Sequence, residues 1–255
     1  MNPFLKNLNR VEFVITYACT GQCKHCSEGD HASIGEHING DIAAEMVGEV
    51  AGNYSIDSIM TFGGEPLLYP DAVCKIHSAG RDAGISKRQL ITNGFFSRDE
   101  VKIKCVAETL VNNGVNDILL SVDAFHQETI PIKPVILFAQ EIHALNAIEI
   151  QVHPAWLVSN EADNIYNRKT REILAEFDAI GISASDGNVI FPRGNALKHL
   201  SEYFDVNAPQ VSPYFENPND IKAICVNPDG EVLGGNIYKT SILEIIENYT
   251  PKTEE

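Results

Sequence analysis

Three cysteines stand close together near the start of the chain, in the stretch "ITYACTGQCKHCSEGD". Cys19, Cys23 and Cys26 are separated by three and then two residues, directly after an apolar run that predicts a strand. Thiolates at this spacing can converge on one soft metal centre. Structural zinc takes four protein ligands, whereas a cubane iron–sulfur cluster held by three cysteines keeps one iron open. The spacing therefore favours an iron–sulfur cluster, with zinc or no metal as the alternatives.

A second motif, "GGEP", ends the next predicted strand and consists of Gly63, Gly64, Glu65 and Pro66. Glycines let the backbone approach a ligand closely, and a carboxylate can pair with an ammonium group. On its own this tetrapeptide is most simply a surface turn. One strand–helix unit after the cysteines, at the ligand-binding edge of a parallel sheet, it indicates a second part of the same site.

Two further groups of residues are candidates for contact with a ligand. Asp123 and His126 follow the fourth predicted strand in "DAFHQE" and are candidates for substrate contact, although a loop and helix cap explains them equally well. Arg193 follows the last predicted strand, where it would pair with a carboxylate or lie on the surface.

The cysteine triad, with His25 just before its last cysteine, and the "GGEP" turn together resemble the radical S-adenosylmethionine (SAM) superfamily. The resemblance implies one 4Fe–4S cluster held by the three cysteines, and SAM whose amino group meets the "GGEP" turn. It further implies that residues at other strand ends contribute to the cofactor site: Asn93, Ser121, Asp123, His153 and Arg193.

The resemblance also implies a reaction. Reductive cleavage of SAM yields a 5′-deoxyadenosyl radical, which abstracts hydrogen from a substrate, and the electron comes from a donor such as flavodoxin or ferredoxin. The substrate is expected to be a peptide, with a small metabolite as the alternative. Two alternatives belong to other functional classes. One is a zinc-stabilised binding protein without catalysis, and the other is an activating enzyme that makes a glycyl radical on a partner protein.

Short apolar runs alternate with segments of helical periodicity along most of the chain, which predicts parallel βα units. Ser97 with Glu100 predicts a capping box, and Pro131 is expected at the first position of its helix. The strands are expected at 11–16, 55–62, 86–94, 115–123, 147–154 and 187–194, and the helices at 41–54, 71–84, 97–114, 131–146 and 167–177.

This alternation predicts an α/β fold, an open partial (βα)6 TIM-like barrel over residues 1–200. Residues 201–255 are expected to form a small C-terminal extension of a loop, a hairpin around "PDG" and a helix that caps the core. The extension resembles those of peptide-modifying radical SAM enzymes but lacks their cluster cysteines, with Cys225 alone. Cys74 and Cys105 fall within predicted helices and are expected to be buried.

Composition limits the partners and the cellular location that we expect for the protein. The formal net charge of −16 argues against a nucleic-acid partner, which favours a basic surface. We read no signal peptide and no spanning segment, so a cytoplasmic location without membrane contact is expected. In that reducing compartment, clustered cysteines favour metal binding over disulfides.

Overall fold

The computed structural model describes residues 2–205 and 216–251. The strands are β1 (Arg10–Val14), β2 (Ser58–Phe62), β3 (Lys87–Thr92), β4 (Asp117–Leu120), β5 (Glu149–Val152), β6 (Ala155–Trp156), β7 (Asn188–Val189), β8 (Ala223–Val226), β9 (Glu231–Val232) and β10 (Gly235–Asn236). The α-helices are α1 (Gly40–Asn53), α2 (Pro70–Asp82), α3 (Glu100–Asn112), α4 (Ala124–Gln127), α5 (Ile132–Leu145), α6 (Ile165–Asp178), α7 (Asn195–Leu200) and α8 (Ile242–Asn248).

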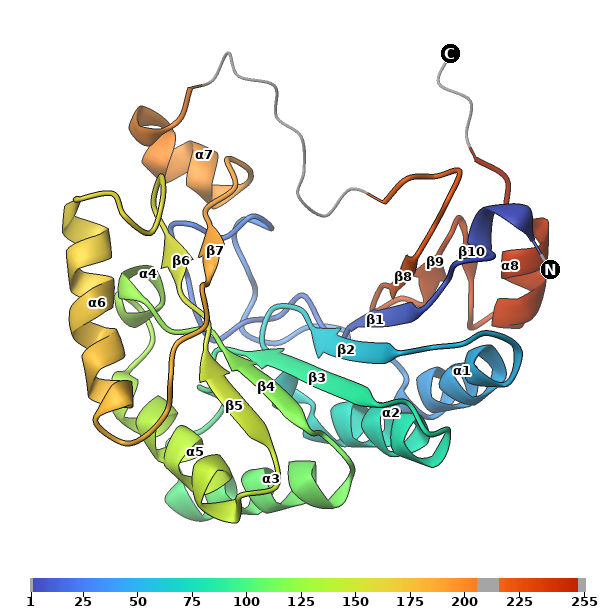
Figure 1. The fold of residues 1–255 in the computed structure, drawn as a ribbon, viewed down its shortest axis with the longest axis horizontal. Coiled ribbons are helices and arrows are strands. Elements are labelled where there is room, and N and C mark those ends of the chain that lie inside the picture. Colours follow the sequence, from blue (N-terminus) through green and yellow to red (C-terminus); the bar gives the residue numbers. More distant parts are fainter. Residues whose placement is uncertain (1, 206–215, 252–255) are drawn as a thin grey trace.

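Six strands form one curved sheet in the order β5-β4-β3-β2-β1-β8, and every pairing in it is parallel. Helices α1, α2, α3 and α5 cover its outer face, while the concave face is open (Figure 1). The α/β class and the open, TIM-like partial barrel are confirmed.

Side chains alternate between the two faces of each strand. On β3, β4 and β5, Leu90, Ile118 and Ile150 belong to the buried core beneath the helices. Their neighbours therefore point to the concave face. Since this face is not closed by further strands, it can carry polar side chains along with apolar ones.

The sixth strand of the sheet is not the one predicted. Residues 187–194 contribute only β7, which pairs with β6 outside the main sheet. Its place is taken by β8, which comes from the predicted extension and pairs with β1 in parallel. Burial explains the difference, because Ile224 and Val226 of β8 are almost fully buried whereas Val189 of β7 is 55% exposed.

Four smaller predictions are also wrong. The antiparallel hairpin is formed by β9 and β10 rather than across the "PDG" turn. Helix α3 is capped by Asp99, whose carboxylate accepts the N–H groups of Val101 and Lys102, and Pro131 is the N-cap of α5 rather than its first residue. Cys105 is exposed on α3, although Cys74 is buried as expected.

The end of the chain packs beside its beginning. The side-chain amide of Asn2 donates to the carbonyls of Ile246 (2.8 Å) and Tyr249 (2.7 Å), which ties α8 to the segment that precedes β1. Residues 206–215 of the predicted loop lie outside the described residues. The division into a core and an extension at residue 200 stays a prediction. In the described parts of the chain, none of the helices has the length and apolarity needed to cross a membrane.

Candidate functional site

The three cysteines lie in a loop that is closed at its base. Thr16 and His37 form an antiparallel bridge, and the N–H of Ile38 donates to the carbonyl of Ile15 (2.8 Å). Within the loop, the N–H of Cys26 donates to the carbonyl of Cys23 (3.2 Å). The loop follows β1, so these contacts hold the cysteines at the carboxyl edge of the sheet, where parallel α/β folds bind ligands.

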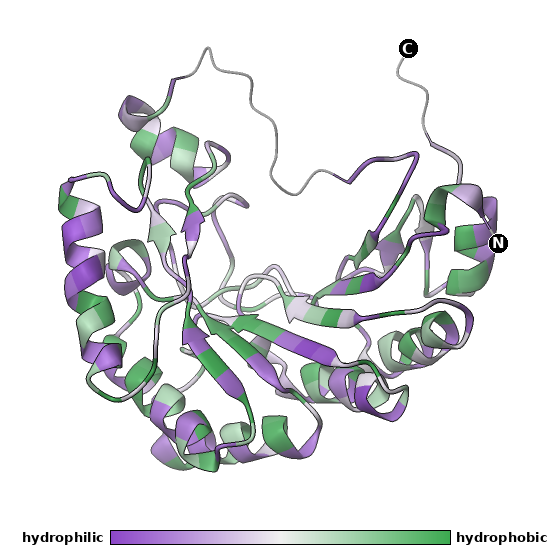
Figure 2. Cartoon of the chain, in the orientation of Figure 1, coloured by the Kyte–Doolittle hydropathy of each residue, from purple (hydrophilic) through white to green (hydrophobic). Residues whose placement is uncertain are grey.

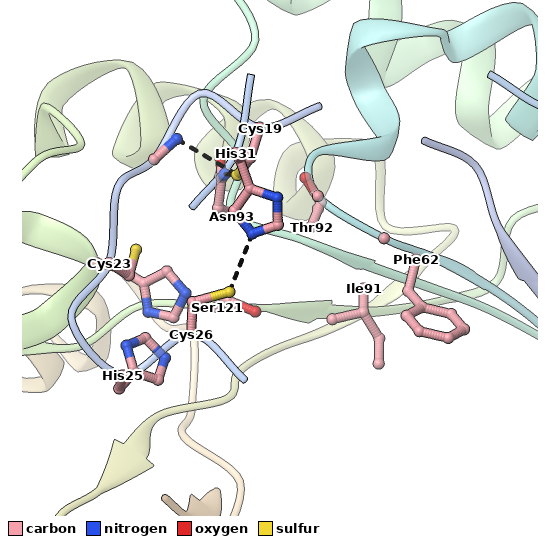
Figure 3. A pocket seen from close by; sticks show the side chains of 14 residues that line it. Cys19, Cys23, His25, Cys26, His31, Phe62, Ile91, Thr92, Asn93 and Ser121 are labelled. Carbon is pink, nitrogen blue, oxygen red and sulfur yellow. Dashed lines mark hydrogen bonds between the residues drawn. The ribbon is translucent and has the colours of Figure 1, made fainter. Parts of the chain in front are cut away.

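A cavity of about 140 Å³ opens between this loop and the ends of β2, β3 and β4 (Figure 3). All three cysteines line it, together with His25 and His31 from the same loop. The rest of its wall consists of Gly21 in the loop, His126 in α4, and the neighbouring strand ends with Phe62, Gly63, Gly64, Ile91, Thr92, Asn93 and Ser121. Residues more than 100 positions apart in sequence therefore meet at one site.

The thiols of this cavity suit a positively charged centre. Burial raises the pKa of Cys19 to about 11 and also raises the pKa of Cys23. Buried thiolates without a cation are costly, and metal binding supplies the charge that stabilises them. The three convergent thiols fit an iron–sulfur cluster, and the buried Nδ1 of His25, which has no hydrogen-bond partner among the described residues, lies in the same wall.

The "GGEP" turn is joined to the cysteine loop by its backbone. The N–H of Gly64 donates to the carbonyl of Thr16 (2.8 Å), and the N–H of Glu65 donates to that of Ala18 (2.8 Å). A Cβ on Gly64 would lie 2.1 Å from the Ala18 oxygen, and Gly63 has a φ of +143°. These two glycines are therefore required by the close approach of two loops, while their other side faces the cavity.

Glu65 lies beneath the cavity rather than in its wall. It is fully buried, and its carboxylate accepts hydrogen bonds from Thr92 Oγ1 (2.7 Å), Asn93 N (2.8 Å) and Leu67 N (2.8 Å). Burial raises its pKa to about 7 even though these three hydrogen bonds oppose the shift. Glu65 thus connects the ends of β2 and β3, and Pro66 is buried beside it.

Asn93 connects the end of β3 to the cysteine loop. Its side-chain amide donates to Thr20 Oγ1 (3.1 Å) and lies 3.6 Å from Cys19 Sγ. Its Oδ1 accepts the N–H of Phe95 (2.8 Å). Together with Ser121 at the end of β4, Asn93 presents polar groups to the cavity. The contact with a cofactor that the resemblance implies for both residues stays a prediction.

Asp123 lies beside two histidines, His25 and His126, just below the cavity wall. The donor atoms of His25, Asp123 and His126 lie within 4.8 Å of one another. Asp123 is fully buried, and its carboxylate accepts from Phe125 N, His126 N, His126 Nδ1 and Ala155 N at 2.8 to 3.0 Å.

The ionisation of these groups follows from that arrangement. Burial would raise the pKa of Asp123, but the neighbouring His126, His25 and Ala155 N–H outweigh it and hold the pKa well below its ordinary value. Burial lowers the pKa of His25 to about 4. Asp123 is therefore an ionised helix cap that positions His126 at the cavity.

Glu65, Pro66 and Asp123 do not line this cavity, and neither do two further predicted residues, His153 and Arg193. His153 is half-buried, with Nδ1 2.8 Å from Ser185 Oγ and Nε2 2.8 Å from the side-chain amide of Asn188. Arg193 is exposed in the segment between β7 and α7. Their roles as cofactor ligands stay predictions, as do those of the residues that the cavity brings together.

Two other residues of the site had no assigned role in the sequence analysis. His31 Nε2 lies 3.1 Å from Cys26 Sγ, while its Nδ1 lies 2.7 Å from the carbonyl of Tyr17. Asn195, which is buried, donates its backbone N–H to the carbonyl of Cys26 (2.9 Å). His31 could be suspected from its place in the loop, but no pattern in the sequence marks Asn195 as a partner of a loop some 170 residues away.

Comparison with known proteins agrees with this geometry. Residues 13–149 match the Radical SAM superfamily. A probable GTP 3′,8-cyclase of Saccharolobus islandicus is 26% identical over 224 residues, which cover 80% of this chain and 67% of that protein. Another of that name, from Methanocaldococcus jannaschii, is 26% identical over 148 residues, 58% of this chain and 47% of that protein.

Solved structures share the fold. Streptococcus suis SuiB bound to its precursor peptide SuiA aligns with a TM-score of 0.62 at 11% identity, over 95% of this chain and 65% of that chain. The enzyme anSMEcpe with bound AdoMet and a peptide aligns with a TM-score of 0.59 at 14% identity, over 94% of this chain and 80% of that chain. This chain thus spans about two thirds of SuiB.

The chain belongs to the radical SAM superfamily, because the family match covers more than half of its length. It is an enzyme, and its cofactors are a 4Fe–4S cluster and SAM. The resemblance seen in the cysteine spacing and the "GGEP" turn is thereby confirmed.

Proposed function

We propose that Cys19, Cys23 and Cys26 hold a single 4Fe–4S cluster and that SAM binds beside it, against the "GGEP" turn. When bound, the cluster would cleave SAM reductively to a 5′-deoxyadenosyl radical, and this radical would abstract hydrogen from a substrate. The observation that carries this proposal is the convergence of three thiols on one cavity that Gly63 and Gly64 also line.

The residues of the chain have separate parts in this proposal. Gly63 and Gly64 offer their backbone to the SAM amino group, and Asn93 and Ser121 offer hydrogen bonds to its polar atoms. Glu65 and Asp123 act as positioning residues, because their carboxylates are already saturated by neighbouring donors. His25 and His126, whose rings lie 4.7 Å apart between centroids, close one side of the cavity and keep water from it.

The substrate is a peptide in our proposal, and a small metabolite is the second candidate. A peptide is favoured because two structures of similar fold contain one, and this likeness is the support for a peptide substrate here. The relatives named GTP 3′,8-cyclase favour a small metabolite instead. We further propose a flavodoxin or ferredoxin as electron donor and the cytoplasm as the compartment, where reduced iron–sulfur proteins are maintained.

Anaerobic reconstitution with iron and sulfide, followed by reduction in the presence of SAM, tests the proposal. We expect the wild type to form 5′-deoxyadenosine, detected by mass spectrometry, and Cys23→Ala to form none. Cys105→Ala is the matched control, since Cys105 is exposed on α3 away from the cavity. A protein that takes up stoichiometric zinc, assembles no cluster and forms no 5′-deoxyadenosine would instead be a structural zinc protein.

A further inference from the structure

Asn93 is a buried polar residue at the point where β3 ends beside the cysteine loop. Figure 2 shows that β3 changes from hydrophilic in its first half to hydrophobic in its second, so Asn93 follows an apolar stretch of strand. The residue is only 5% exposed, and its backbone N–H donates to Glu65 Oε2 (2.8 Å). Because buried polar groups are hydrogen-bonded, the neighbours of Asn93 decide which way its side-chain amide points.

The two ends of the Asn93 amide are assigned by the groups around them. The N–H of Phe95 donates to Oδ1 (2.8 Å), and a backbone N–H can only donate, so this end of the amide is the oxygen. The amide nitrogen therefore faces the cysteine loop, where it donates to Thr20 Oγ1 (3.1 Å) and lies 3.6 Å from Cys19 Sγ. With the amide reversed, two N–H groups would face each other at Phe95.

The amide nitrogen carries two hydrogens, and its contacts offer an acceptor for each. Thr20 Oγ1 takes one of them, and Cys19 Sγ is the acceptor within reach of the other. The backbone N–H of Gly21 donates to the same sulfur (3.4 Å). Figure 3 shows Asn93 beside Cys19 at the cavity. Two amide N–H groups, one from the backbone and one from a side chain, therefore meet the sulfur of Cys19.

The contact at Cys26 is of a different kind. His31 Nε2 lies 3.1 Å from Cys26 Sγ, and whether an imidazole nitrogen donates depends on its tautomer and its protonation. A carboxamide keeps both of its hydrogens at every pH at which the protein is folded. The donor role of Asn93 at Cys19 is therefore set by geometry alone.

Hydrogen bonds to the ligand sulfurs are among the properties that set the reduction potential of an iron–sulfur cluster. The cluster gains one negative charge when it is reduced, and an N–H that points at a ligand sulfur stabilises this charge. The effect is strengthened by burial, because solvent screens a buried interaction less. Amide donors at Cys19 would therefore raise the potential of the cluster and make its reduction easier.

We propose that Asn93 is a positioning residue that acts through Cys19, and that the hydrogen bond from its Nδ2 to Cys19 Sγ raises the reduction potential of the cluster. This inference rests on the proposed function, because it requires the cluster at the three cysteines. In the step concerned, the electron-donor protein loses one electron and the cluster gains it, while no bond forms or breaks at Asn93. Its Oδ1 keeps a second lone pair, so a contact with SAM would use a different atom.

Redox titration of the reconstituted full chain without SAM, followed by electron paramagnetic resonance, tests the inference. Asn93→Leu removes the amide donor at similar size. At the wild-type midpoint, we expect the ratio of reduced to oxidised cluster to be about three- to tenfold lower in this variant, where tenfold corresponds to about 59 mV for one electron. Thr20→Val is the matched control, because it removes the other acceptor of the same amide and leaves Asn93 beside Cys19. Its ratio should stay within about twofold of the wild type.

The outcomes separate this inference from the proposed function. A wild-type midpoint in Asn93→Leu, or an equal fall in Thr20→Val, overturns the inference. If Asn93→Leu does not retain its cluster, Asn93→Ser is measured instead, because a serine hydroxyl can still accept the N–H of Phe95 but is too short to replace the amide at Cys19. Loss of the cluster in both variants would make Asn93 a structural support and also overturns the inference. A wild type that assembles no cluster contradicts the proposed function itself.

Discussion

The two ends of the same strands treat their polar groups differently. At the carboxyl ends, beside the cysteine cavity, Glu65 accepts three hydrogen bonds and Asp123 accepts four, all from within the chain. At the amino ends, Asp117 accepts from Gln89 (3.1 Å) and pairs with Lys87 (2.7 Å), while Glu149 is exposed and no cation pairs with it among the described residues. Buried, saturated groups fix the geometry of a site before a ligand arrives, whereas exposed charges are screened by solvent. The comparison thus assigns cofactor binding to a rigid region at the carboxyl ends of the strands.

The largest expected effect distinguishes the cysteines of the cavity from Cys225 on the edge strand β8. Cys26→Ala should reduce the iron content of the reconstituted chain from about four per chain to background, because it removes a cluster ligand. Cys225→Ala should keep that iron, since Cys225 lies in register with Glu12 on the sheet edge and does not line the cavity. Iron analysis and electron paramagnetic resonance check this. Equal loss in both variants would mean that Cys225 also holds iron.

The next effect probes the rigid region through its glycines. Gly64→Ala should destabilise the protein by roughly 1–3 kcal/mol or more and lower cluster occupancy, because its Cβ would collide with the Ala18 carbonyl. Gly48→Ala in α1, where no atom lies within 4 Å of the new Cβ, should be neutral or stabilising. Urea unfolding measures both. A harmless Gly64→Ala would show that the two loops are not held together as described.

A third prediction compares one carboxylate from each region. Asp123→Asn should lower the free energy of unfolding by about 2 kcal/mol at neutral pH, since hydrogen bonds to a buried charge are lost. Glu149→Gln should leave it within about 0.5 kcal/mol.

The pH dependence of that difference has a definite sign. The folded-state pKa of Asp123 lies below its ordinary value of 3.8. Its stabilisation is therefore fully present above pH 3.8 and declines as the pH falls through the folded-state pKa. Urea unfolding from pH 7 down to pH 3 should show the Asp123→Asn deficit shrinking at the acid end. A deficit that grows toward acid would contradict the assignment.

The smallest effect is expected at the amino ends of the strands. Lys87→Gln removes an ion pair with Asp117 that is half exposed on the lysine side, so stability should change by less than about 1 kcal/mol. Urea unfolding measures the change, and a loss of about 3 kcal/mol or more would mean that the pair is shielded from solvent.

Much of the framework could be predicted from local patterns. The strands β1 to β5 and the helices α1, α2, α3, α5 and α6 fall where alternation and helical periodicity place them, because each is decided by which of its own residues seek burial. Strand β8 could not be assigned in this way, since "AICV" has the same apolar character whether it forms a hairpin or joins a sheet. Only the open edge of β1 decides between these.

The candidate site also has parts that the sequence determined and parts that only the tertiary structure decided. The sequence by itself determined the cysteine triad, the "GGEP" turn and their order along the βα units, because metal-ligand spacing and close backbone approach are local properties. Only the tertiary structure decided that Glu65 and Asp123 are saturated supports and that Asn195 holds the cysteine loop from a distant helix. It alone brought Gln89, Asp117 and Glu149 into one layer, since register between parallel strands depends on packing across the whole sheet.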